Sequence, residues 1–552
     1  MRGKKWRSAA LCFLAISIVS SIVAARYGKD ALAAQKLPKL KVATRLVEIN
    51  VIVDDKNGKP ISDLTQKDFS LFDGGHQQTI SLFTPATSKT LPTPPLAMPP
   101  DTYTNLLAAH GGVPPSTTII LLDGLNTALT DQSYARAQVL KFLSQIQPQD
   151  HVALYALGMK LTILQDFTTD ASNLVAALTR YKNDTAADIR AAHVQHVHHG
   201  IDLAELNAAI TFANQNGERI FQSNQVAMTL AALNAIARHV QGLPGRKNLI
   251  WVSSEFPVCF CFHNQNPLLN DNEHYYANPV EQTAQLFADA NIAVYPVDAR
   301  GLVGPDLGLV VGPGFHPSSK GLTVAINTNF LMEDMASWTG GLAFSNTNDI
   351  MGAIRRAVND ADVSYVLGYY PAHNDWKGEF RKIKVKVDQR GLKVRAREGY
   401  FAMPDLQYKP KDINAILALM ALSPLDATGI ALAARITPVP TDAARAIAVT
   451  VHFDPKGIQF TSAGNTQTAN IQYAIFELDK TGKIVGGENK PFKIQVSPTA
   501  YQIGLKEGMA FSATEPVVSD AVDLCILLRD DNTGAAGSLH IPLAKYQTDE
   551  KK

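Results

Sequence analysis

The stretch from Thr117 to Thr127 constrains the fold of this chain most, because an unbroken apolar strand ends there on a single carboxylate. It reads Thr-Thr-Ile-Ile-Leu-Leu-Asp-Gly-Leu-Asn-Thr, and a helical pattern follows from Gln132 to Ile146. Ligands of open parallel sheets bind just outside the carboxyl ends of the strands. The sequence therefore predicts that Asp123 lies at the functional edge of such a sheet, with Asn126 and Thr127 beside it. A strand-end carboxylate with hydroxyl oxygens is the outline of a hard-cation site.

From Ser116 onward, strand and helix patterns alternate. The strand patterns are Thr117 to Leu122, His151 to Leu157, Leu161 to Gln165, Asn248 to Ser253, Ile292 to Val297 and Ser364 to Tyr370. The helical patterns after the first one are Ser172 to Tyr181, Gln225 to Gln241, Val280 to Ala290, Phe330 to Trp338 and Asp349 to Asp360. Strands separated by helices favour crossover connections and a mainly parallel sheet. We expect a doubly wound α/β domain over residues 116–403, with one antiparallel edge made by the hairpin that contains Gly158.

Two β-rich regions flank this domain. Residues 42–84 read as a small N-terminal β module, because Val47, Ile49 and Val51 alternate with polar residues before a turn at Asn57-Gly58. The Pro-rich stretch 85–115 is typical of a linker. Residues 410–548 contain short alternating strands between turns, which predicts a C-terminal β-sandwich.

Charge and size exclude some classes of function. The chain has 552 residues with 51 basic and 50 acidic side chains, so no net field favours nucleic acid. We expect no nucleic-acid partner.

The N-terminus has the pattern of an export signal. Lys4, Lys5 and Arg7 precede an apolar run from Ala9 to Ala25, and small-residue cleavage sites follow. Residues 1–34 are therefore expected to be a signal peptide or, alternatively, an uncleaved membrane anchor. Both alternatives place the rest of the chain in the periplasm, at the envelope or outside the cell.

Six motifs in order resemble the bacterial von Willebrand factor A-related family that is typical of acidobacteria. They are Leu-Thr-Gln-Lys-Asp-Phe at 64–69, Leu-Asp-Gly-Leu-Asn-Thr at 122–127, Asp-Phe-Thr-Thr-Asp at 166–170, Tyr-Pro-Val-Asp-Ala-Arg-Gly at 295–301, Tyr-Tyr-Pro at 369–371 and Arg-Glu-Gly-Tyr at 397–400. The resemblance covers roughly residues 42 to 402. It implies a von Willebrand factor A-like sheet, export, and protein binding or adhesion, often through a divalent cation.

The resemblance also implies a set of cation ligands, beginning with an Asp-x-Ser-x-Ser loop. Here Asp123 and Thr127 are retained, but Leu125 replaces the first Ser and removes an oxygen. A Thr from a second loop is expected at Thr185, with Thr169 as the weaker alternative.

The third loop of related domains reads Thr-Asp-Gly and supplies a carboxylate. Ser254 stands in that position, and only the neighbouring Glu255 could compensate. We therefore expect no cofactor, with Mg²⁺ or Ca²⁺ binding at most weakly. The buried Asp123 would instead be held by backbone N–H groups and by hydroxyls such as those of Thr127 and Ser254.

Catalytic patterns are weak in this sequence. His193, His196, His198 and His199 crowd one stretch, and the first two have a helical i, i+3 spacing that can chelate a metal. No Ser nucleophile elbow is present. We interpret the chain as a non-enzymatic module that binds a protein or envelope component at the Asp123 edge. The alternative is an extracytoplasmic metal-dependent hydrolase that uses Asp123, Glu255 or the histidines.

Overall fold

The structure, a computed structural model, describes residues 46–87, 99–106, 117–147, 150–182, 224–254, 272–302, 330–360, 363–371, 376–404, 410–439 and 446–546. Within these ranges, no helix is both long and apolar enough to cross a bilayer. The expected signal or anchor at 1–34 lies outside the described residues, as do Thr185, the histidines from His193 to His199, and Glu255.

The centre of the fold is a five-stranded sheet in the order β10-β9-β6-β7-β8. Its strands are β6 (Thr117–Asp123), β7 (Val152–Leu157), β8 (Leu161–Thr168), β9 (Lys247–Ser253) and β10 (Ile292–Asp298). The four strands from β10 to β7 are parallel, and β8 pairs antiparallel with β7. The prediction of a mainly parallel α/β sheet with one antiparallel edge is confirmed.

Different helices pack on the two faces of this sheet. Successive side chains of a strand point to opposite faces, so Leu121 and Ile120 of β6 belong to separate cores. One core includes residues of the helical segment 224–240, of α5 (Asn272–Asp289) and of α6 (Phe330–Thr339). The other includes α1 (Leu129–Leu143), α2 (Ala171–Arg180) and α7 (Ile350–Asn359).

The local sequence explains how these helices begin and which face they bury. The Asp170 carboxylate accepts a hydrogen bond from the Ser172 N–H at the start of α2. Asp349 caps α7 in the same way, by accepting from the Gly352 N–H. The buried residues of α7 are Ile350, Ala353, Ile354, Ala357 and Val358, which is the i, i+3, i+4, i+7 spacing of a helix with one apolar face.

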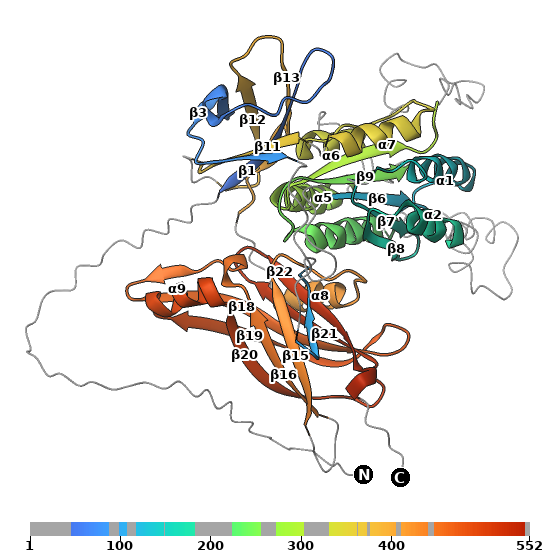
Figure 1. Ribbon diagram of the computed structural model, residues 1–552. Helices are drawn as coiled ribbons and strands as arrows, with labels where there is room; N and C mark the ends of the chain where they lie inside the picture. The colour runs from blue at the N-terminus through green and yellow to red at the C-terminus, as the bar shows by residue number, and fades with distance from the viewer. Residues whose placement is uncertain are drawn as a thin grey trace, which may run out of the picture. The chain divides into compact units, whose positions relative to one another are not determined.

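The N-terminal β module is built from two distant parts of the chain (Figure 1). One sheet has the order β13-β1-β11-β4 and the other β14-β12-β2-β3. The early strands are β1 (Val47–Asp54), β2 (Phe69–Asp73), β3 (His76–Gln78) and β4 (Leu82–Thr87). The late strands are β11 (Val363–Tyr369), β12 (Phe380–Val387), β13 (Lys393–Ala396) and β14 (Gly399–Phe401).

This arrangement corrects the prediction that Ser364 to Tyr370 belongs to the parallel sheet. The strand there, β11, lies antiparallel between β1 and β4. Tyr365, Leu367 and Tyr369 pack in the core of the β module, because their partners are the apolar residues of β1 and β2. Residues 42–84 therefore do not form this module alone, and the region expected to end at 403 contributes four of its strands.

The C-terminal region contains two further sheets, in the orders β20-β16-β15-β5 and β17-β18-β21-β22, with β19 paired to β18. Their strands are β5 (Thr102–Thr104), β15 (Leu432–Val439), β16 (Ala446–Phe453), β17 (Thr461–Ala463), β18 (Thr466–Leu478), β19 (Ile484–Val496), β20 (Met509–Pro516), β21 (Asp523–Asp530) and β22 (Ala536–Pro542). Two helices, α8 (Pro410–Ala421) and α9 (Pro498–Glu507), accompany them. Because β5 pairs with β15, part of the expected linker 85–115 is a strand.

Candidate functional site

Asp123 ends β6 at the carboxyl-end edge of the central sheet, which we define by the residues that end or follow β6, β9 and β10. Only 2% of Asp123 is exposed. The loop after it turns tightly, because the N–H groups of Gly124 and Leu125 both donate to the Leu157 carbonyl at the end of β7. The strand-end position predicted from the sequence is the position observed.

Four donors surround the Asp123 carboxylate. Oδ1 accepts the Asn126 backbone N–H at 3.0 Å. Oδ2 accepts the Asn126 Nδ2 at 2.8 Å, the Trp251 indole Nε1 at 2.9 Å and the Ser253 hydroxyl at 3.0 Å. Burial raises the pKa of Asp123, and the hydrogen bonds from Asn126, Trp251 and Ser253 act in the opposite direction.

The predicted hydroxyl partners, Thr127 and Ser254, lie at the same edge but make other bonds. Thr127 Oγ1 accepts the Ser254 N–H at 3.1 Å. The Ser254 hydroxyl donates to Asp131 Oδ2, also at 3.1 Å. The expectation that these two hydroxyls hold Asp123 is therefore wrong. Ser253 and Trp251 do so instead, because alternation along β9 turns them toward the face on which Asp123 lies.

The side chain of Leu125, which was expected to lack an oxygen, and the alternative ligand Thr169 do not contribute to the site. Leu125 is 6% exposed and packs in the core with the helical segment 224–240. Thr169 follows β8, and since Thr168 pairs with Val152 at the start of β7, Thr169 lies at the opposite end of the sheet from Asp123. Thr169 therefore cannot supply an oxygen atom to this edge.

The described part of the implied donor set does not fit a hard cation. Ca²⁺ and Mg²⁺ take about six or more oxygen ligands. Each carboxylate oxygen has about two lone pairs; three donors already share Oδ2 of Asp123, and the Asn126 N–H takes one position on Oδ1. Asn126 Oδ1 is a buried acceptor without a partner, but it is a single oxygen. Among the described residues, no three His, Cys, Asp or Glu side chains gather as a metal cluster would.

The end of β10, on the far side of β9 from β6, carries a second carboxylate with its own counterion. Asp298, at the end of β10, is 4% exposed. The Arg300 guanidinium donates hydrogen bonds to both carboxylate oxygens of Asp298, with Nε 3.0 Å from Oδ1 and Nη2 2.8 Å from Oδ2. The Asp298 charge is therefore balanced by the chain itself.

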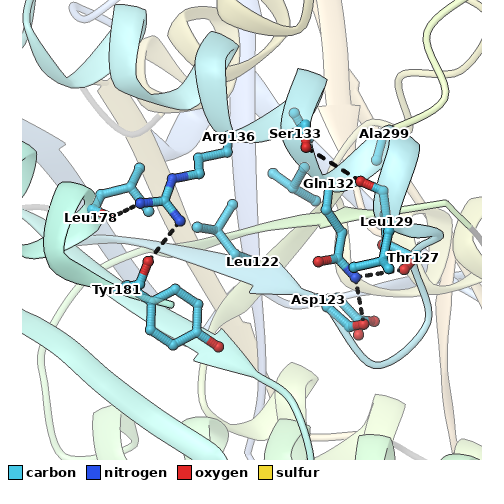
Figure 2. Close-up of a pocket in the computed structure, with 13 residues that line it drawn as sticks. Leu122, Asp123, Thr127, Leu129, Gln132, Ser133, Arg136, Leu178, Tyr181 and Ala299 are labelled. Carbon is cyan, nitrogen blue, oxygen red and sulfur yellow. Dashed lines mark hydrogen bonds between the residues drawn. The ribbon is translucent and has the colours of Figure 1, made fainter. Parts of the chain in front are cut away.

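A cavity of about 190 Å³ opens beside Asp123, between β6, α1 and the end of α2 (Figure 2). Its apolar lining consists of Leu122, Leu129, Ala135, Leu178, Val252 and Ala299. Gln132 Nε2 donates to the carbonyls of Gly124 and Thr127. The Arg136 guanidinium donates to the carbonyls of Leu178 and Tyr181 at the end of α2. These polar side chains hold the walls of the cavity together.

Sequence reasoning missed Trp251 as a partner of Asp123. It also missed Thr229, whose hydroxyl accepts from Asn126 Nδ2 at 2.8 Å. Trp251 and Asp123 are 128 positions apart, so no local motif joins them. The available signal was the indole N–H of Trp251 among the apolar residues Leu249, Ile250 and Val252, since a buried Trp N–H usually finds an acceptor.

Comparisons with known proteins add little to this geometry. No family model matches the chain, and no curated protein matches it.

Three similar solved structures come from bacteria. An aerotolerance-related membrane protein from Bacteroides fragilis is 15% identical, with 44% of this chain and 98% of that chain covered and a TM-score of 0.24. BatB from Bacteroides thetaiotaomicron is 12% identical, with coverage of 45% and 98% and a TM-score of 0.22. The vWF domain of the type V pili tip protein Mfa5 from Porphyromonas gingivalis is 12% identical, with coverage of 45% and 96% and a TM-score of 0.24. Similarities this low do not assign the fold, which rests on the sheet topology itself.

Proposed function

We propose that this protein is an exported protein-interaction or adhesion module that binds a protein or envelope component at the carboxyl-end edge of a von Willebrand factor A-like sheet. The cavity beside Asp123 is the observation that carries the proposal. It lies at the edge where open α/β sheets bind their ligands, and its lining is mostly apolar. Pockets of this kind receive the anchoring side chains of protein partners.

Exposed apolar side chains at the same edge support a protein partner. Leu129 lines the cavity and is 43% exposed. Leu302, after β10, is 61% exposed, and its N–H is held by Asn348 Oδ1 at 2.9 Å. Large apolar side chains that flank a pocket gain free energy when a partner covers them.

The binding role is proposed in preference to a metal-dependent hydrolase because of the environment of Asp123. A general base or a metal ligand needs a free lone pair directed at its target. Three donors already share Oδ2 of Asp123 and the Asn126 N–H binds Oδ1, which leaves at most one lone pair, on Oδ1, for a target. The other residues of the hydrolase alternative, Glu255 and the histidines from His193 to His199, lie outside the described residues.

The proposal is tested by capture from the envelope fraction of the native cells. The tagged full chain should fractionate outside the cytoplasm and retain a specific partner, and Leu129→Asp should lose that partner because it places a charge at the cavity mouth. Ile503→Asp is the matched control, since Ile503 is 52% exposed on α9. Equal capture by both variants would contradict the proposed surface, and cytoplasmic fractionation would contradict export.

A further inference from the structure

Trp251 approaches Asp123 from the neighbouring strand because of the register of the sheet. Leu121 of β6 lies beside Trp251 of β9, and alternation places Asp123, Trp251 and Ser253 on the same face. The indole N–H can therefore reach the carboxylate two positions further along β6, at 2.9 Å. We infer that the Trp251 indole takes the place of a divalent cation at Asp123, so that recognition at this edge is independent of Mg²⁺ and Ca²⁺.

A buried carboxylate needs compensation, and the chain supplies it without a metal. An ionised group in a dry interior is very costly unless donors or charges surround it. Asp123 is 2% exposed, and four donors surround its carboxylate, three at Oδ2 and one at Oδ1. Three of the donors belong to side chains, namely Asn126, Trp251 and Ser253. The Asn126 amide is itself oriented by the Thr229 hydroxyl.

A cation at Oδ2 of Asp123 would have to displace one of the three donors there. Metal–oxygen distances for Mg²⁺ and Ca²⁺ are about 2.0 to 2.6 Å, which places the ion where the donor hydrogens now lie. Trp251 is 1% exposed and packs in the core beside Leu249 and Leu121. Moving its ring would open a cavity among close-packed side chains. The indole is therefore a permanent part of the site, whereas a bound ion can be exchanged.

Two hydroxyls at this edge, those of Thr127 and Ser254, make hydrogen bonds within the chain. Thr127 accepts from the Ser254 N–H, and the Ser254 hydroxyl donates to Asp131. These bonds tie the loop after β6 to the end of β9.

The cation half of the inference is tested on the full-length chain without any partner. Calorimetric titration with Mg²⁺, Ca²⁺ and Mn²⁺ should show no binding tighter than about 1 mM, because three donors already share Oδ2 of Asp123 and a hard cation takes about six or more oxygen ligands. Fluorine NMR of the chain labelled with 5-fluorotryptophan gives a local readout. The resonance of Trp251, assigned through Trp251→Phe, should stay as sharp in Mn²⁺ as that of Trp338. Micromolar Mn²⁺ that selectively broadens the Trp251 resonance, and does not do so in Asp123→Asn, would overturn the inference.

The indole half is tested by a double-mutant cycle between Trp251→Phe and Asp123→Asn. We expect the two changes to be coupled roughly tenfold to hundredfold in the unfolding equilibrium constant, as for a hydrogen bond to a charged group. Trp338→Phe with Asp123→Asn is the control pair, and it should be additive because Trp338 packs against Phe380 and Phe401. Additivity of the Trp251 pair would contradict the assigned role.

The last part of the inference rests on the proposed function, and its test can be separated from that function. Partner capture should be equal in EDTA and in Mg²⁺. Loss of capture in EDTA would overturn cation independence, whereas absence of any partner in both conditions would contradict only the proposed binding role.

Discussion

His540 in β22 must carry a positive charge, because both of its ring nitrogens face oxygen acceptors. Nδ1 lies 2.7 Å from Asp426 Oδ1, and Nε2 lies 3.0 Å from the Ala421 carbonyl. A neutral imidazole has only one N–H. Burial lowers the pKa of His540, but the hydrogen bonds and charges of Asp426 and Cys525 outweigh it, so the pKa lies above the ordinary value.

Because of this raised pKa, the contribution of His540 to the stability of the fold depends on pH. A group with a higher pKa in the folded state stabilises it fully below the unfolded pKa of about 6.5, and the contribution is lost as pH rises through the folded pKa. We expect His540→Gln to lower the free energy of unfolding by roughly 1.5 to 3 kcal/mol near pH 6. The difference from the wild type should shrink at alkaline pH. Thermal unfolding from pH 6 to 10 measures it, and a constant difference would contradict the charged state.

At the scale of elements, Asp73 links the two sheets of the β module. Its Oδ2 accepts the hydroxyls of Tyr369 on β11 and Tyr400 on β14, and its Oδ1 accepts Arg381 Nε on β12. Asp73 is 1% exposed, so its loss would leave buried donors and a cation without their acceptor. One carboxylate at the end of β2 thus connects strands that lie about 300 positions later in the chain.

Replacing this carboxylate should unfold the module far more readily than removing one of its donors. We expect Asp73→Ala to cost about 3 to 5 kcal/mol, as when one partner of a buried ion pair is removed. Tyr369→Phe should cost about 1 kcal/mol, because it removes a single hydrogen bond. Chemical denaturation of both variants measures the costs. Equal costs would show that Asp73 does not act as the common acceptor.

At the scale of the whole molecule, the β module makes the early and late segments depend on each other. β1 pairs with both β11 and β13, and β2 pairs with β12. A protease site engineered into residues 88–98 would cut the chain between these partners. The fragment containing β1 to β4 should still co-elute with the rest in size-exclusion chromatography and separate only in denaturant. Its release under native conditions would contradict the discontinuous module.

The sequence by itself determined the features that depend on local periodicity. Alternating strands and helices predicted the parallel sheet, and the short hairpin after Leu157 predicted its antiparallel edge. The apolar run that ends on Asp123 placed the carboxylate at the carboxyl-end edge. Each of these conclusions needs only neighbouring residues, because side-chain direction and capping are set within a turn or a strand.

Tertiary structure alone decided which partners these elements meet. An apolar strand such as β11 has the same sequence pattern whether it joins a parallel sheet or a β module. Only its pairing with β1 and β4 shows to which sheet it belongs. In the same way, the sequence showed that Asp123 needs donors but not that Trp251 and Ser253 supply them. Those contacts follow from the register between β6 and β9. This register is set only when the whole sheet assembles, because strands so far apart in the chain pair correctly only if the apolar side chains on both faces of the sheet become buried.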